Sequence, residues 1–273
     1  HTWISSQVGG LPEDDEALQY WLSEGFTEFY TARLMVRGGQ WTAEQYAADL
    51  NDALLAYAQS PVRAATNAQV LANFWIDRDT QRLPYQRGRF LAMVWEARLR
   101  AGGHSMDEVV HDMRARARSG GQYAVENFAA SAAGFGMDPG ADIEANVTQG
   151  RAILLPEDLL APCGRIVTRE APVFHRGFDI QATQANSNVI AGVDPSLPAY
   201  AAGLRNGMVL IRRDGGEIGN SELEIGYVAR DGDTERTFRY MPRGAVTFTV
   251  QRLQVTESLE GDRLAQCLSV IGG

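Results

Sequence analysis

The hydrophobic pattern of this chain changes once, near residue 160, and that change most limits the fold. Before it, apolar residues recur at helical spacing, and between Asp14 and Arg37 they are Leu18, Trp21, Leu22, Phe26, Phe29, Tyr30 and Leu34. From about Gly164, the apolar segments are short and β-branched, and turn dipeptides such as Asp214-Gly215 separate them. We therefore predict an α+β multidomain protein, with an all-α part first and a small, mainly β part second.

Capping and breaking residues divide the first part into separate helices. Ser105 and Glu108, for example, have the spacing of a capping box. We expect helices over 14–37, 42–58, 85–100, 105–118 and 122–133, with shorter pieces at 68–75 and 142–149, and a mixed stretch between Pro61 and Pro84. The predicted domains are 1–160 and 164–256, with a linker near 155–162 and a C-terminal tail over 257–273.

The residue counts exclude several kinds of chemistry. All 25 basic residues are arginine, so no lysine can form a Schiff base or serve a P-loop. The formal net charge of −9 argues against a nucleic-acid binder, and no apolar run approaches the roughly 18 residues of a membrane span. No two of the four histidines are four positions apart, which excludes a complete H-E-x-x-H zinc helix; they are His1, His104, His111 and His175.

The segment from Trp21 to Tyr30 carries the most specific pattern. It reads W-L-S-E-G-F-T-E-F-Y, and Glu24 lies 23 positions after His1. Gly25 interrupts a helical pattern, which usually has a packing or close-approach reason. Taken alone, the segment also fits an amphipathic helix with Glu24 on a solvated face.

This segment resembles the glycyl aminopeptidase family of gluzincin metallopeptidases. In gluzincins, zinc is held by two histidines of H-E-x-x-H and by a glutamate in a later W-x-x-E-G motif, and this family typically reads W-F-S-E-G-F-T-x-Y-Y there. His1-Thr2-Trp3 is similar to the end of H-E-x-x-H-x-W. Residues 85–88, Y-Q-R-G, resemble a Tyr-x-Lys-Gly helix start, and residues 105–108, S-M-D-E, resemble the family's S-L-D-D. The resemblance covers nearly all of the 273 residues.

The resemblance implies a gluzincin-like catalytic subdomain that uses zinc-activated water to hydrolyse a bond in a peptide or protein substrate. His1 and Glu24 would be zinc ligands, and Tyr85 would stabilise the oxyanion. The first histidine and the catalytic glutamate of H-E-x-x-H would precede residue 1, so we expect the 273-residue chain to be inactive by itself. Tyr85 could instead only pack, and Glu28 could support Glu24 or be solvated. The alternative function is a pseudopeptidase that binds peptides or serves as a scaffold.

The second part resembles a PDZ domain. Residues 200–210, Y-A-A-G-L-R-N-G-M-V-L, are similar to the A-x-x-A-G-L-x-x-G-D segment, with Met208 in place of the aspartate. Gly177, Phe178, Asp179 and Ile180 resemble the Gly-Φ-Gly-Φ loop, which implies capture of a peptide ligand. Asp179 replaces the second glycine and would repel a terminal carboxylate if its side chain pointed inwards. A β domain that only packs on the helical one is the alternative.

The two cysteines bracket the second part. Because glycyl aminopeptidases are often exported, we expect a secreted or periplasmic protein in which Cys163 and Cys267 form a disulfide that holds the tail. Two buried free thiols are the alternative.

Overall fold

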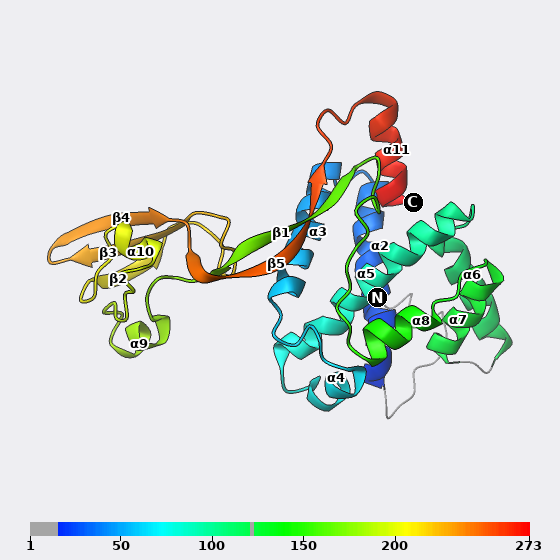
Figure 1. Cartoon of the computed structure of the whole chain (residues 1–273), viewed down its shortest axis with the longest axis horizontal. Helices are drawn as coiled ribbons and strands as arrows, with labels where there is room; N and C mark the ends of the chain where they lie inside the picture. The colour runs from blue at the N-terminus through cyan, green and yellow to red at the C-terminus, as the bar shows by residue number, and fades with distance from the viewer. Residues whose placement is uncertain (1–15, 121–122) are drawn as a thin grey trace. The chain divides into compact units, whose positions relative to one another are not determined.

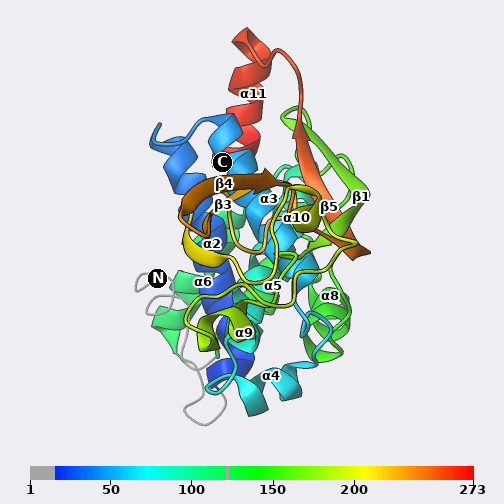
Figure 2. The same ribbon diagram turned by 90° about the vertical axis from the view of Figure 1, so that its left-hand side faces the viewer.

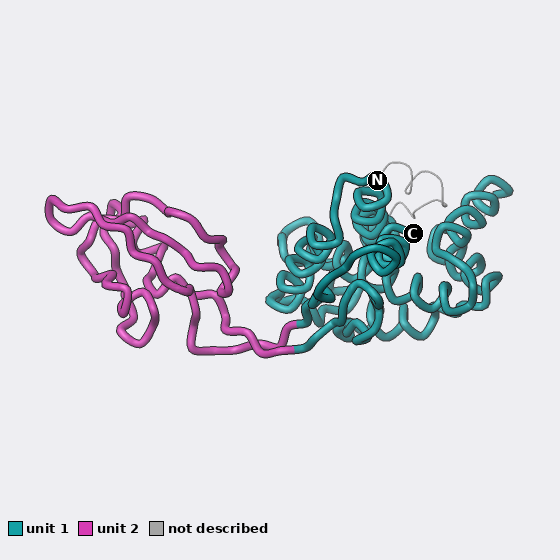
Figure 3. The backbone as a smooth tube through the Cα atoms, turned by 90° about the horizontal axis from the view of Figure 1, so that it is seen from above, with its two compact units in different colours: residues 1–168, 251–273 teal, residues 169–250 magenta. Residues whose placement is uncertain are grey.

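A computed structural model describes residues 16–120 and 123–273. The chain forms two compact units (Figure 3): unit 1 comprises His1–Thr168 and Gln251–Gly273, and unit 2 comprises Arg169–Val250. Unit 1 is built mainly from helices and unit 2 mainly from strands, so the predicted α+β class is confirmed. No helix among the described residues is both long and apolar enough to span a membrane.

The helices of unit 1 follow the predicted order, with bounds set largely by caps. Thr42, Thr66 and Ser105 each close a capping box, which satisfies two otherwise unpaired N–H groups at the start of a helix. The bounds are η1 Glu16–Gln19, α2 Tyr20–Arg37, α3 Ala43–Gln59, α4 Asn67–Asn73, α5 Arg78–Ala101, α6 Met106–Ser119, α7 Ala124–Gly134, α8 Gly140–Asp142, η2 Ile143–Thr148 and α11 Gly261–Gly272 (Figure 1).

Helix α5 is longer than the sequence predicted. It begins at Arg78 because Asp77 caps it, accepting a hydrogen bond from the Thr80 N–H at 2.9 Å. Pro84 lies inside the helix and is buried, although proline removes one backbone donor there. The predicted mixed stretch up to Pro84 and the predicted start at Tyr85 were therefore wrong, because a strong cap and burial outweigh the proline.

Helices α2 and α5 run side by side through unit 1 (Figures 1 and 2). An aromatic cluster packs around them: the ring of Phe128 from α7 lies 5.0 Å from Trp95 and 5.3 Å from Phe26, measured between centroids. Trp21 packs edge-on against Trp95. Such large buried rings supply much of the apolar area in a core, so this cluster fixes α2 against α5.

Unit 2 holds a three-stranded antiparallel sheet in the order β2-β3-β4. A second, two-stranded sheet pairs β1 with β5, the strands through which the chain enters and leaves unit 2. β1 Gly164–Phe174 and β5 Arg243–Val255 cross the boundary between the two units, and the elements that lie wholly in unit 2 are α9 Ile180–Ala185, α10 Pro198–Ala201, β2 Val209–Arg213, β3 Ile225–Asp231 and β4 Thr234–Tyr240.

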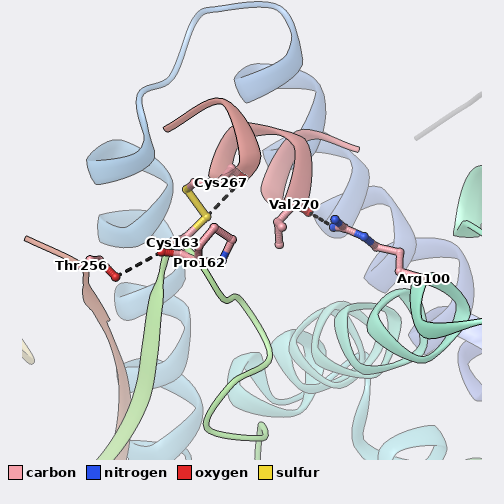
Figure 4. Close-up of a disulfide and its surroundings, with 6 residues drawn as sticks. All are labelled: Arg100, Pro162, Cys163, Thr256, Cys267 and Val270. Atoms are coloured by element: carbon pink, nitrogen blue, oxygen red, sulfur yellow. Dashed lines mark hydrogen bonds between the residues drawn. A yellow bond between two sulfur atoms is a disulfide. The ribbon is translucent and has the colours of Figure 1, made fainter. Parts of the chain in front are cut away.

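The last residues of the chain fold back onto unit 1. In the structure, Cys163 and Cys267 form a disulfide (Figure 4). Of the two predicted alternatives, a disulfide and two free thiols, the structure has the disulfide. Nearby, Arg100 Nη1 donates to the carbonyl oxygen of Val270 at 2.9 Å, and α11 packs against α2. Residues 257–273 were predicted to be a separate tail, whereas residues 251–273 belong to unit 1 and Gly261–Gly272 form α11.

Candidate functional site

Two glycines bring α2 and α5 together at one point. A Cβ built on Gly25 would lie 2.6 Å from the carbonyl carbon of Gly88, and one built on Gly88 would lie 2.7 Å from the Cα of Gly25 and closer still to the carbonyl oxygen of Trp21. Only glycine permits backbones to approach so closely. The glycine in each sequence motif is therefore a packing residue at the crossing of two helices.

This crossing places the two predicted site residues next to each other. Glu24 precedes Gly25 on α2, Tyr85 lies three residues before Gly88 on α5, and their side chains lie close enough that each shifts the pKa of the other. Glu24 is only 5% exposed. The structure thus brings together two residues that are 61 positions apart in the sequence, and this proximity was not predicted.

Burial dominates the electrostatics of this pair. It raises the pKa of Glu24, while the interaction with the Tyr85 hydroxyl acts in the opposite direction. Burial, followed by the negative charge of Glu24, raises the pKa of Tyr85 to about 12. Tyr85 is therefore a neutral hydroxyl at physiological pH and can donate a hydrogen bond.

A cavity of about 560 Å³ opens beside Tyr85, within the size range of small-ligand sites. Its lining comes from three helices: Glu28 of α2, Ala53 of α3, and from α5 Arg78, Gln81, Arg82, Tyr85, Gln86 and Arg89. The arginines and glutamines of this lining were not predicted from the sequence. The helical spacing of Arg78, Gln81 and Arg82 could have indicated this lining. The spacing was overlooked because the helix was expected to begin at Tyr85.

Arg87, which stands where the family has lysine, has a structural role. It is 1% exposed, and its Nη2 donates to the carbonyl oxygens of Arg63 at 3.1 Å and Ala65 at 2.5 Å. Burial lowers its pKa, and the interaction with Tyr57 opposes that shift. Arg87 therefore ties the segment between α3 and α4 to α5.

The described residues supply one candidate zinc ligand. Glu24 fits by donor type, because a carboxylate is a common zinc ligand and a buried one gains from a nearby cation. His1 lies outside the described residues. Among residues 16–120 and 123–273, no three His, Cys, Asp or Glu side chains are grouped so that they could hold a metal ion.

The remaining histidines of unit 1 lie away from this pair. His104 packs its ring 5.2 Å from that of Phe135, between centroids, and its Nδ1 lies 3.5 Å from Glu108 Oε1. His111 is exposed on α6. Glu28 is exposed in the cavity lining.

In unit 2, the chain uses the predicted peptide-binding loop for its own folding. The Gly177 N–H donates to Nδ1 of His175 at 2.9 Å, and the Asp179 N–H donates to the Ala191 carbonyl oxygen at 2.9 Å. Phe178 is buried in the core of unit 2. Two backbone donors that would meet a terminal carboxylate are thus engaged within the chain.

The residues after this loop form a helix. Asp179 caps α9, accepting from the Ala182 N–H at 2.9 Å, and Ile180 is the first residue of that helix. Addition of a peptide to a sheet requires an exposed strand edge, which a helix does not offer. Peptide capture by Gly177, Phe178, Asp179 and Ile180 stays a prediction.

Comparison with known proteins supports the resemblance in part of unit 1. Residues 11–87 match the family model of the M61 glycyl aminopeptidases, so the predicted resemblance is confirmed over that segment, which contains Glu24, Gly25 and Tyr85. No curated protein matches the chain.

Among solved structures, the chain is similar to the crystal structure of an aminopeptidase N family protein from Idiomarina loihiensis. The sequences are 17% identical and the TM-score is 0.48; the match covers 92% of this chain and 49% of that one. The chain thus spans about half the length of this relative.

Proposed function

We propose that this chain is part of a zinc-dependent aminopeptidase of the glycyl aminopeptidase kind, with Glu24 and His1 as zinc ligands and Tyr85 as an oxyanion-stabilising residue. The observation that carries the proposal is the close approach of α2 and α5 at Gly25 and Gly88, which places Glu24 next to Tyr85 beside a cavity of about 560 Å³. Both residues lie in the segment that matches the M61 family model.

The chain's own residues would contribute binding and orientation. When bound, zinc would polarise the attacking water. Gly25 packs against Gly88 directly beside Glu24, and this contact would fix the backbone from which Glu24 reaches the metal. Tyr85 keeps its proton at physiological pH, so its hydroxyl would donate to the oxygen of the substrate carbonyl as negative charge develops there.

Zinc content tests the ligand assignment. The protein in its longest natural form should bind about one zinc ion per chain, and His1→Ala or Glu24→Ala should each lower that content sharply. Glu28→Ala is the matched control, because Glu28 is one turn from Glu24 on α2 and exposed. Unchanged zinc content in both ligand variants contradicts the assignment.

Hydrolysis kinetics test the role of Tyr85. Tyr85→Phe should lower kcat by about 10²- to 10³-fold with little change in KM, as expected for a donor that acts in the transition state. The rival is a pseudopeptidase that binds peptides without cleaving them. The residues directly before His1 decide between the two, since H-E-x-x there supports the enzyme and any other sequence supports the rival.

We also propose a PDZ-like fold for unit 2 and an exported location. The antiparallel order β2-β3-β4 and the turn at Gly203, whose φ is +103°, support the former. The disulfide between Cys163 and Cys267 supports the latter, because such bonds persist in oxidising compartments.

A further inference from the structure

The cavity beside Tyr85 has a positively charged wall, although the chain as a whole carries a formal charge of −9. Three of its lining residues are Arg78, Arg82 and Arg89, and among the described residues the acidic side chain in the lining is that of Glu28. Arg89 is 4% exposed and its Nη2 lies 2.5 Å from Asp49 Oδ2, so its charge is compensated. The charge that a ligand would meet therefore comes from Arg78 and Arg82.

These two arginines are exposed and face the cavity without compensation. Within residues 16–120 and 123–273, neither guanidinium takes part in an ion pair. Both lie in the first two turns of α5, where the helix dipole disfavours cations. Helix stability thus does not account for their position, whereas an anionic ligand would.

We infer that Arg78 and Arg82 form a carboxylate-binding subsite, which makes the substrates peptides with a carboxylate shortly after the scissile bond. This inference rests on the proposed function for the role of Tyr85. A guanidinium is suited to the task because its planar N–H groups match the two oxygens of a carboxylate.

The spacing along α5 sets the position of that carboxylate. Residues 78, 82, 85 and 89 lie on one stripe of the helix. At 1.5 Å per residue, Arg82 lies about 4.5 Å and Arg78 about 10.5 Å along the axis from Tyr85. An extended peptide advances about 3.3–3.6 Å per residue, so the carboxylate would lie roughly one to three residues beyond the carbonyl that Tyr85 contacts.

Glu28 limits where an anion can bind. It contributes to the same lining from α2, and its negative charge would repel a carboxylate. The carboxylate is therefore expected to bind toward Arg78 and Arg82, on α5. Removing the charge with Glu28→Gln should strengthen binding of an anionic peptide.

Two sources can supply the same chemical group, namely the C-terminus of a short peptide and an acidic side chain of a longer one. The test measures calorimetric binding to the 273-residue chain, with metal removed by a chelator so that no hydrolysis competes. The probes are Gly-Ala-Ala as the free acid, Gly-Ala-Ala amide, and Gly-Glu-Ala amide. The free acid should bind about tenfold more tightly than its amide, the effect of a charge-assisted contact.

The variant Arg78→Gln/Arg82→Gln should abolish that difference, and Arg118→Gln should keep it, because Arg118 is exposed on α6 and outside the lining. Tight binding of Gly-Glu-Ala amide would assign the site to side chains, and weak binding would assign it to C-termini. Equal affinity for acid and amide, a difference that survives in the double variant, or no measurable binding of the free acid would each overturn the inference.

The outcome is separable from that of the proposed function. If the zinc-loaded protein cleaves free acid and amide equally well and binds them equally, the aminopeptidase assignment stands and the subsite does not. If the arginine-dependent preference is found but the protein neither binds zinc nor cleaves peptides, the subsite stands and the catalytic assignment does not.

Discussion

The crossing of α2 and α5 predicts that the smallest enlargement of either glycine destabilises unit 1. In an ordinary helix interior, Gly→Ala stabilises by about 0.5–1 kcal/mol. Here the added methyl of Gly25→Ala would lie 2.6 Å from a backbone carbon of Gly88, whereas non-bonded carbon atoms pack at about 3.5–4.0 Å. Since backbone atoms cannot rotate away, the helices must separate by about 1 Å.

We expect a net loss of stability for both variants. Overpacking in a core costs about 1–3 kcal/mol, and a clash with backbone atoms that cannot move aside belongs to the upper part of that range, about 2–3 kcal/mol. A propensity gain of about 1 kcal/mol then leaves a net destabilisation of about 1–2 kcal/mol. With a urea m-value of about 2 kcal/mol per molar, the midpoint should fall by about 0.5–1 M. Gly88→Ala should cost at least as much, because its methyl also meets the Trp21 carbonyl.

Tryptophan fluorescence during urea unfolding is the natural assay, because all five tryptophans belong to unit 1. Gly134→Ala is the control, since Gly134 is helical and a Cβ there would meet nothing within 4 Å; its midpoint should stay within a few tenths of a molar. The variant with both substitutions should lose less than the sum of the two, because one separation of the helices relieves both clashes. A midpoint for Gly25→Ala equal to or above that of the unsubstituted protein would refute the close approach.

Two further predictions concern stability. Replacing Cys163 and Cys267 by serine should cost about 2–5 kcal/mol, since the bond closes a loop of 104 residues; urea unfolding with and without reductant measures this, and identical curves would contradict it. Arg33→Met should lower the free energy of unfolding by about 3–5 kcal/mol, because it leaves the buried charge of Glu96 without its cationic partner. The variant removes the ion pair between Arg33 Nη2 and Glu96 Oε1 at 3.1 Å, and Glu96 Oε2 keeps the hydrogen bond from the Met106 N–H at 2.7 Å. Adding Glu96→Gln should recover part of that loss, and a further drop in the midpoint would argue against the ion pair.

The sequence predicted the helices of unit 1 well where local signals agreed. A capping box at Ser105, for example, predicts a start that the structure confirms. It failed at α5, where the helix was predicted to begin at Tyr85, after Pro84, and the cap at Asp77 was not considered. It also missed α11, although Leu264, Cys267, Leu268 and Ile271 recur at helical spacing, because a short amphipathic segment at the end of a chain resembles a tail until its partner surface is known.

For the candidate site too, the sequence predicted the features that depend on local patterns and not those that depend on contacts between distant residues. The identities of Glu24 and Tyr85 came from local motifs, whereas their proximity depends on a contact between distant parts of the chain, which no local pattern encodes. A signal was nevertheless present. Gly25 and Gly88 each lie in a helix beside a predicted site residue, and a glycine there is costly unless something packs against it.

The contact between Gly25 and Gly88 makes it possible to test the positioning of the site residues separately from their chemistry. A methyl at Gly88 should shift Tyr85 relative to Glu24 and loosen the fold at once, because the same contact serves both purposes. Tyr85→Phe removes only the hydroxyl and leaves the crossing intact. If Gly88→Ala lowered activity as much as Tyr85→Phe while its unfolding midpoint fell by about 0.5–1 M, the two motifs would act as one unit, in which the glycines set the distance and the flanking side chains use it. If activity followed the hydroxyl alone, the crossing would matter for stability and the site would tolerate about 1 Å of displacement.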